Sequence, residues 1–168
     1  MANLEPLIQS IPVAPLKLAS LEGCRTLADQ VNNYLVSFRH ESPTNVGQAD
    51  SLQGYCADSY LLECECPRFG SGEGKGVLKE SVRGCDLFIM VDVTNYSLTY
   101  RVNGYENHMS PDNHYQDLKR IISAANGKAR RINVIMPFLY EGRQHKRSKR
   151  ESLDCALALQ ELTRMGVS

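Results

Sequence analysis

The stretch Arg131-Ile132-Asn133-Val134-Ile135-Met136-Pro137 decides the fold, together with the polar segment 140–151, Tyr-Glu-Gly-Arg-Gln-His-Lys-Arg-Ser-Lys-Arg-Glu. The apolar, β-branched run from Ile132 to Met136 is typical of a buried strand, and Pro137 ends it because proline cannot donate to a ladder. Apolar residues at helical spacing then start near Ser152. We therefore expect a strand, a polar loop and a helix, an arrangement whose loops bind ligands in α/β sheets.

The polar loop, residues 143–150, carries a dense set of cations. It holds five Lys or Arg residues and one His, with Gln144 next to Arg143. Arginine offers a planar fork of donors that suits phosphate, and glutamine offers a donor and an acceptor that suit a base edge. The residues alone leave two interpretations open: an anion or nucleotide site, or a solvated charged loop, which is what charge runs usually are.

Strands and helices alternate along the rest of the chain. The patterns predict strands at 16–19, 59–66 and 86–92 and helices at 25–38 and 110–125, with 1–15 as an extended lead-in and 41–58 as a loop. Ser110 and Pro111 are a good helix start, and Asn126-Gly127 is a left-handed helix end. This order predicts one α/β domain over residues 1–168, a mostly parallel sheet flanked by helices in three layers.

Two further segments are informative. Residues 68–77 contain Gly70, Gly72, Gly74 and Gly76, which predicts a mobile loop or hairpin tip; no Gly-Lys-Ser/Thr ending is present, so it is not a P-loop. Phe69 at its start either packs onto its own core or offers a stacking surface to a planar ligand or partner chain. Residues 93–109 are rich in Tyr and Asn and predict a long loop.

Composition limits the function classes. Formal net charge is zero, with 11 Lys and Arg against 6 Asp and Glu in residues 110–168. That basic third fits a phosphate ligand, whereas the neutral total argues against a nucleic-acid binder. The six cysteines lack zinc-site spacing, so we expect reduced structural thiols and no metal site. Neither a signal peptide nor a run long enough to cross a bilayer is present, which predicts a cytoplasmic protein with no membrane partner.

Several motifs follow one another in a recognisable order. They are Leu16-Lys17-Leu18 before a helix, Arg68-Phe69-x-x-Gly72-Glu73, Glu80-Ser81-Val82-Arg83-Gly84-Cys85-Asp86 before a strand, and Arg143-Gln144 six residues after Pro137. In this order they resemble the N-terminal half of ribose-phosphate pyrophosphokinase, also called phosphoribosyl pyrophosphate synthetase. The resemblance implies a phosphoribosyltransferase-like fold and a transfer of pyrophosphate from ATP to ribose 5-phosphate, with Mg²⁺ as cofactor.

The resemblance also implies roles for particular residues. Arg143, Gln144 and Lys146 would contact the nucleotide, and Phe69 of a neighbouring subunit would stack on its adenine, with Ser71 and Glu73 beside the base. This implies a homodimer or a larger homo-oligomer that binds ATP. The catalytic residues, and the loop that binds ribose 5-phosphate, would belong to the family's second domain, whose Asp-Asp-x-x-x-Thr-Gly motif does not occur in these 168 residues.

Some positions depart from the family's pattern. Ser71 stands where the family has Asp, His145 stands where it has Asp, and Lys146 replaces an Arg and so keeps the charge without the bidentate fork. Three functions are therefore weighed: the nucleotide-binding and subunit-association half of the enzyme, inactive alone; a non-catalytic regulatory relative; and, least favoured, a nucleic-acid-binding module.

Overall fold

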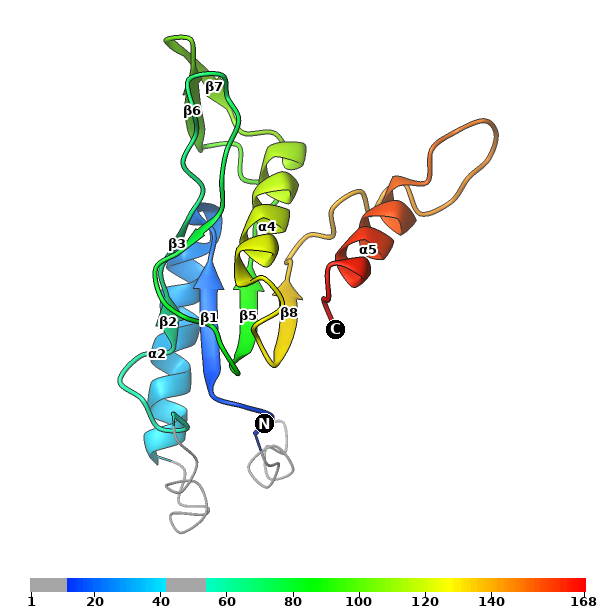
Figure 1. Cartoon of the computed structure of the whole chain (residues 1–168). Coiled ribbons are helices and arrows are strands. Elements are labelled where there is room, and N and C mark those ends of the chain that lie inside the picture. The colour runs from blue at the N-terminus through cyan, green and yellow to red at the C-terminus, as the bar shows by residue number, and fades with distance from the viewer. Residues whose placement is uncertain (1–11, 42–53) are drawn as a thin grey trace.

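A four-stranded parallel sheet forms the centre of the molecule (Figure 1). The structure is a computed structural model that describes residues 12–41 and 54–168. The strand order is β2-β1-β5-β8, and each neighbouring pair is parallel. The bounds are β1 (Leu16–Ser20), β2 (Leu61–Leu62), β5 (Asp86–Met90) and β8 (Arg131–Ile135). The mostly parallel sheet expected from the sequence is confirmed.

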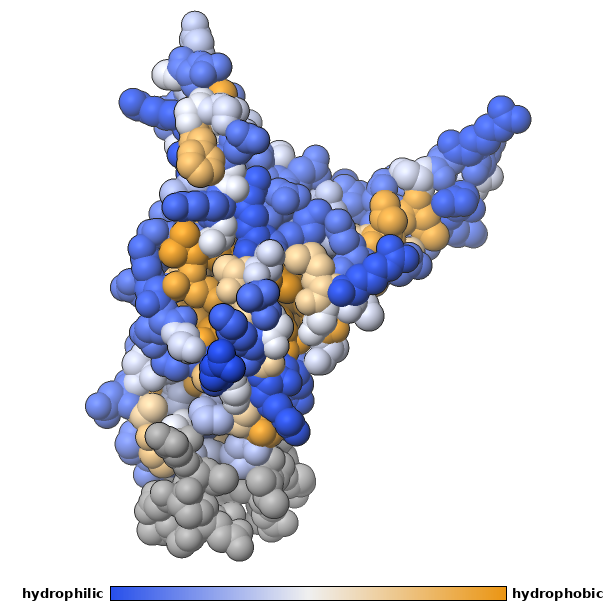
Figure 2. All heavy atoms as spheres, in the orientation of Figure 1, coloured by the Kyte–Doolittle hydropathy of each residue, from blue (hydrophilic) through white to orange (hydrophobic). Residues whose placement is uncertain are grey.

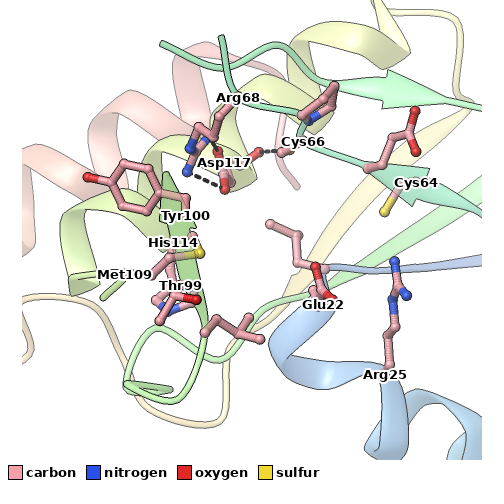
Figure 3. A pocket seen from close by; sticks show the side chains of 14 residues that line it. Glu22, Arg25, Cys64, Cys66, Arg68, Thr99, Tyr100, Met109, His114 and Asp117 are labelled. Atoms are coloured by element: carbon pink, nitrogen blue, oxygen red, sulfur yellow. Dashed lines mark hydrogen bonds and ion pairs between the residues drawn. The ribbon is translucent and has the colours of Figure 1, made fainter. Parts of the chain in front are cut away.

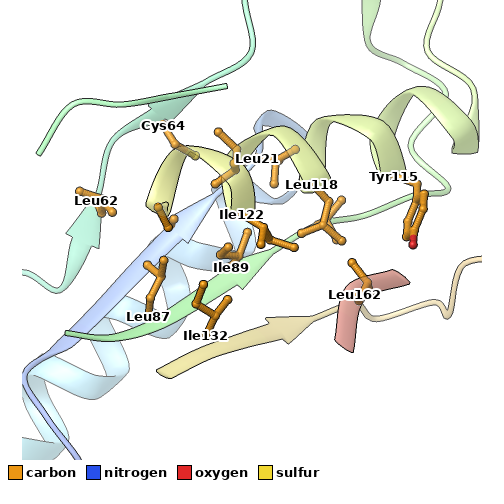
Figure 4. Packing of buried hydrophobic residues seen from close by; sticks show 14 of the residues in the cluster. Leu21, Leu62, Cys64, Leu87, Ile89, Tyr115, Leu118, Ile122, Ile132 and Leu162 are labelled. Carbon is orange, nitrogen blue, oxygen red and sulfur yellow. The ribbon is translucent and has the colours of Figure 1, made fainter. Parts of the chain in front are cut away.

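Helices cover both faces of this sheet, which gives the three expected layers (Figure 1). Alternate residues of β5 point to opposite faces, as in any strand. Leu87 and Ile89 join the buried cluster of α4 (Pro111–Ala125) and α5 (Asp154–Arg164), which Figure 4 shows. Phe88 and Met90 join the smaller cluster beneath α2 (Arg25–Glu41), which the short 3₁₀ helix η1 (Glu22–Cys24) precedes.

The strand order changes direction between β1 and β5. The connection through α2 leads from β1 to β2 on one side, and the connection through α4 leads from β5 to β8 on the other. The Leu21 N–H donates to the Met90 carbonyl at 3.0 Å, so the carboxyl ends of the two strands lie together. Such a switch point is where open α/β sheets bind their ligands.

The single strand expected over 59–66 is wrong, because two strands occupy it. β2 belongs to the central sheet, whereas β3 (Cys64–Glu65) pairs antiparallel with β4 (Val77–Leu78). The chain passes from the central sheet to the second sheet at Glu63. The Glu63 carbonyl accepts the Lys79 N–H at 3.0 Å, which directs the chain away from β1.

The long loop expected over 93–109 is also wrong, because it contains a β-hairpin. β6 (Thr99–Val102) and β7 (Tyr105–His108) are joined by Asn103 and Gly104, at φ 51° and 86°. Asn-Gly between two extended runs is the strongest short-range hairpin signal, since both residues tolerate positive φ. The hairpin projects from the sheet beside the segment that follows β3 (Figure 1).

The other expected elements are confirmed with small shifts of their ends. The Ser110 hydroxyl accepts the Asn113 N–H at 3.2 Å at the start of α4, and Asn126 ends that helix at φ 49°. α5 begins at Asp154, two residues after the expected start. The lead-in 1–15 and the loop 41–58 fall largely outside the described residues. Within the described ranges no helix is long and apolar enough to cross a membrane; the cytoplasmic location stays a prediction.

Candidate functional site

Residues 67–75, the Phe69 loop, form an ordered hairpin tip. The Phe69 N–H donates to the Glu73 carbonyl at 2.7 Å, and the Gly72 N–H donates to the Phe69 carbonyl at 2.9 Å. Gly72 has φ 89°, a conformation that favours glycine, and Arg68 and Gly74 form an antiparallel bridge below it. The hairpin tip predicted from the glycines is confirmed.

The three residues predicted on this loop gather at its exposed tip. The Phe69 side chain is 54% exposed, so the interpretation that packs it onto its own core is wrong. Ser71 and Glu73 are also exposed, and the Ser71 hydroxyl donates to the Glu73 carboxylate at 2.8 Å. The Phe69 ring and the Glu73 carboxylate therefore both face solvent on one short loop. A ring can stack on a planar ligand, and a carboxylate can accept hydrogen bonds from the amino groups of such a ligand.

A buried ion pair holds the root of the loop on α4. The Arg68 guanidinium binds both oxygens of Asp117 at 2.6 and 2.8 Å (Figure 3). Arg120 binds the same carboxylate at 2.6 Å. The side chains of Arg68 and Asp117 are only 9% and 6% exposed. A two-point guanidinium–carboxylate contact fixes direction as well as distance, so the position of Phe69 is tied to α4.

A cavity of about 280 Å³ lies under this root, at the carboxyl end of β1 (Figure 3). Its walls come from η1 and the start of α2, from β3, from the base of the β6–β7 hairpin and from α4, and include Glu22, Arg25, Cys64, Tyr100 and His114. Burial raises the pKa of the Cys64 thiol to about 11 and that of Cys66 to about 12. Both thiols are therefore protonated at neutral pH and poor metal ligands. No sequence pattern predicts this cavity, since its walls come from four separate segments.

The basic loop, residues 143–150, projects between β8 and α5 on another part of the molecule (Figure 1). Its start is held by the Gln144 N–H, which donates to the Glu141 carbonyl at 2.8 Å, and by the Gln144 carbonyl, which accepts the Cys155 N–H at 3.4 Å. Arg143, Gln144 and Lys146 are exposed. Figure 2 shows the tip of this projection as hydrophilic and its root, near α5, as hydrophobic.

The two predicted halves of the site do not meet within one chain. Figure 1 shows the Phe69 loop beside the β6–β7 hairpin, on the opposite side of α4 from the basic loop. The structure thus groups Phe69, Ser71 and Glu73, and separately groups Arg143, Gln144 and Lys146. No set of three or more His, Cys, Asp or Glu side chains in ranges 12–41 and 54–168 is arranged to hold a metal ion.

Comparison with known proteins gives the family. A family model described as the N-terminal domain of ribose phosphate pyrophosphokinase matches residues 16–166. The chain belongs to this family. The resemblance drawn from the sequence motifs is thereby confirmed.

Curated relatives agree with the family model. Ribose-phosphate pyrophosphokinases of Corynebacterium ammoniagenes, Bacillus cereus and Bacillus anthracis are each 29% identical over 135 residues, which is 80% of this chain. The match covers 31% of each relative, so the chain spans about a third of their length. A phosphoribosylpyrophosphate synthetase structure from Mycobacterium smegmatis superposes with a TM-score of 0.60 at 23% identity, over 90% of this chain and 40% of that one. It shares the fold.

Proposed function

We propose that this chain is the nucleotide-binding and subunit-association part of a ribose-phosphate pyrophosphokinase. The observation that supports this most is the exposed Phe69 ring on an ordered, anchored loop, far from the cationic loop of the same chain. Large exposed aromatic rings are unfavourable in water, because burying one is worth roughly 1.5–3 kcal/mol. A second copy of the chain would cover Phe69 and bring Arg143 and Gln144 to it, with a nucleotide between them.

The chemistry of the two loops is complementary to ATP. The Phe69 ring stacks on the adenine, and the Glu73 carboxylate accepts a hydrogen bond from its amino group. On the other chain, Arg143 and Lys146 neutralise phosphate oxygens, and Gln144 binds a base or ribose edge. Ser71 supports Glu73, to which its hydroxyl already donates.

Two further partners belong to this proposal. Mg²⁺ enters with the phosphates of the nucleotide, because magnesium is usually held by substrate phosphates and one or two carboxylates rather than by an all-protein cage. A symmetric dimer is the smallest assembly in which each copy both gives and receives a Phe69 loop. Ribose 5-phosphate binding would need residues of the family's second domain.

Calorimetric titration with ATP tests the role of Arg143. We predict that Arg143→Ala weakens binding by about 1.5–3 kcal/mol, the range for hydrogen bonds to a charged group. Arg150→Ala is the matched control, since it removes the same charge from the same loop outside the Arg-Gln pair. Equal and small losses in both variants would mean that residues 143–150 act only as a solvated charged loop.

A second candidate, a regulatory relative without catalysis, is favoured by one contact. Ser71 stands where the family has a second acidic residue. Its hydroxyl donates to the Glu73 carboxylate and so uses one of the acceptor positions of that carboxylate. A regulator that uses only the subunit interfaces would form dimers in sedimentation and yet show no heat on ATP titration. That pair of results would replace the first proposal with this one.

A further inference from the structure

The β6–β7 hairpin contacts the Phe69 loop at three points. The Asn103 N–H donates to the Gly70 carbonyl at 3.2 Å. The Val102 side chain lies against Gly72, where an added Cβ would come within 2.9 Å of the Val102 Cγ2 atom. The Arg68 guanidinium lies over the Tyr100 ring, 5.3 Å from its centroid.

These contacts all use one face of the hairpin. Tyr100 and Val102 are two residues apart on β6 and therefore point the same way, while Thr99 and Arg101 point the other way. Asn103 can direct its N–H at Gly70 because it lies in the turn at positive φ, followed by Gly104. The sequence of the hairpin thus matches the shape of the neighbouring loop on one side only.

The β6–β7 hairpin and the tip of the Phe69 loop stabilise each other. A two-stranded hairpin is marginally stable in water, and all four residues of β7 are exposed. The Phe69 loop is equally short of apolar residues, since Gly70, Ser71 and Gly72 follow the ring. Its root is held by Asp117, and the hairpin contacts the tip through the pairs described above.

We propose that the β6–β7 hairpin is a positioning element that holds the Phe69 loop in its ligand-ready shape before any ligand arrives. This rests on the proposed function, because Phe69 is the stacking residue there. A loop that is already ordered loses less conformational freedom on binding, so its affinity for a nucleotide rises. The hairpin touches no ligand in this account and acts only through Gly70, Gly72 and Arg68.

Val102→Ala removes one contact from the loop-facing side, and Arg101→Ala is the matched control on the opposite side of the same strand. A second variant replaces residues 99–108 by Asn-Gly. The Met109 N–H donates to the Leu98 carbonyl at 2.8 Å, so the two ends of the deleted segment already lie close enough for a short turn to join them. Amide hydrogen exchange of Phe69 and Gly72 in the free protein reports loop order. ATP titration of the same variants reports the consequence.

We expect Val102→Ala to speed amide exchange at Phe69 and Gly72 and to weaken ATP binding by about fivefold. The shortened hairpin should also speed exchange at these residues and should weaken ATP binding by about tenfold or more. Arg101→Ala should change neither. Unchanged exchange in both hairpin variants would overturn the inference, and so would faster exchange with unchanged ATP affinity. If the wild-type chain binds no ATP, the proposed function fails, and the exchange rates still decide whether the hairpin orders the loop.

Discussion

Cys64 and Cys66 show how burial sets the chemistry of single residues at the base of the Phe69 loop. Cys64 is 6% exposed, and burial raises its pKa from the ordinary 9.0 to about 11. The Asp117 carboxylate adds to burial at Cys66, whose pKa rises to about 12. Thiolates are the reactive form of cysteine, so neither side chain should react at neutral pH.

We predict that brief alkylation at about pH 8 modifies the exposed Cys56 and leaves Cys64 and Cys66 unmodified, as peptide mass spectrometry would show. The raised pKa values also make stability fall with pH. Because the folded chain keeps these protons more tightly, the contribution of both thiols to stability is complete below pH 9.0. It is lost as the pH rises through about 11 for Cys64 and about 12 for Cys66. Labelling of Cys64 as fast as Cys56 would mean that the cavity is open.

Sequence reasoning succeeded for residues whose role depends on near neighbours. Ser110 and Asn126 were predictable because a helix cap involves residues within three or four positions. The contact between Arg68 and Asp117 was not predictable, because 49 positions separate the two residues in the sequence. The sequence left open whether Phe69 packs onto its own core or faces outward, so its exposure and its distance from Arg143 both needed the fold.

At the scale of elements, the contact between the Phe69 loop and α4 is the most sensitive. Asp117→Ala would leave two guanidinium groups, Arg68 and Arg120, without their shared carboxylate. Breaking a buried ion pair by removing one partner costs about 3–5 kcal/mol. We predict a loss of that size in chemical unfolding, together with proteolytic cleavage at residues 67–75.

Gln116→Ala is the control for this prediction, since Gln116 is the exposed neighbour of Asp117 on the same helix. It should change the unfolding free energy by less than about 0.5 kcal/mol. Similar losses in both variants would show that α4, rather than the ion pair, had been disturbed.

The elements themselves were predictable where their pattern was long. The period of α4 and the apolar runs of β5 and β8 were sufficient, whereas two-residue strands such as β2 and β3 have no periodicity to detect. In α2 the spacing of apolar residues predicted the helix correctly, but it did not predict which side chains of the helix are buried. Leu27 and Tyr34 are 40% and 63% exposed, and the polar Asn32 is buried because its side-chain oxygen accepts the Tyr60 N–H at 2.8 Å.

At the scale of the whole molecule, the proposed function assigns this chain one part of a two-substrate reaction. Pyrophosphate transfer needs both substrates and the metal in one geometry. The 168 residues contain no Asp-Asp-x-x-x-Thr-Gly motif for ribose 5-phosphate. We predict no phosphoribosyl pyrophosphate when this chain is incubated with ATP, Mg²⁺ and ribose 5-phosphate, and turnover above a no-protein control would contradict this.

The central claim is that each nucleotide site is shared between two chains, and mixing two variants that are each defective in ATP binding tests it most directly. Phe69→Ala and Arg143→Ala should each abolish tight ATP binding alone. In a mixed dimer, one of the two sites combines the intact Phe69 of one chain with the intact Arg143 of the other. We predict that an equal mixture recovers tight binding in about a quarter of its sites, as random exchange in a symmetric dimer requires. No recovery, in a mixture shown by sedimentation to form dimers, would contradict a shared site.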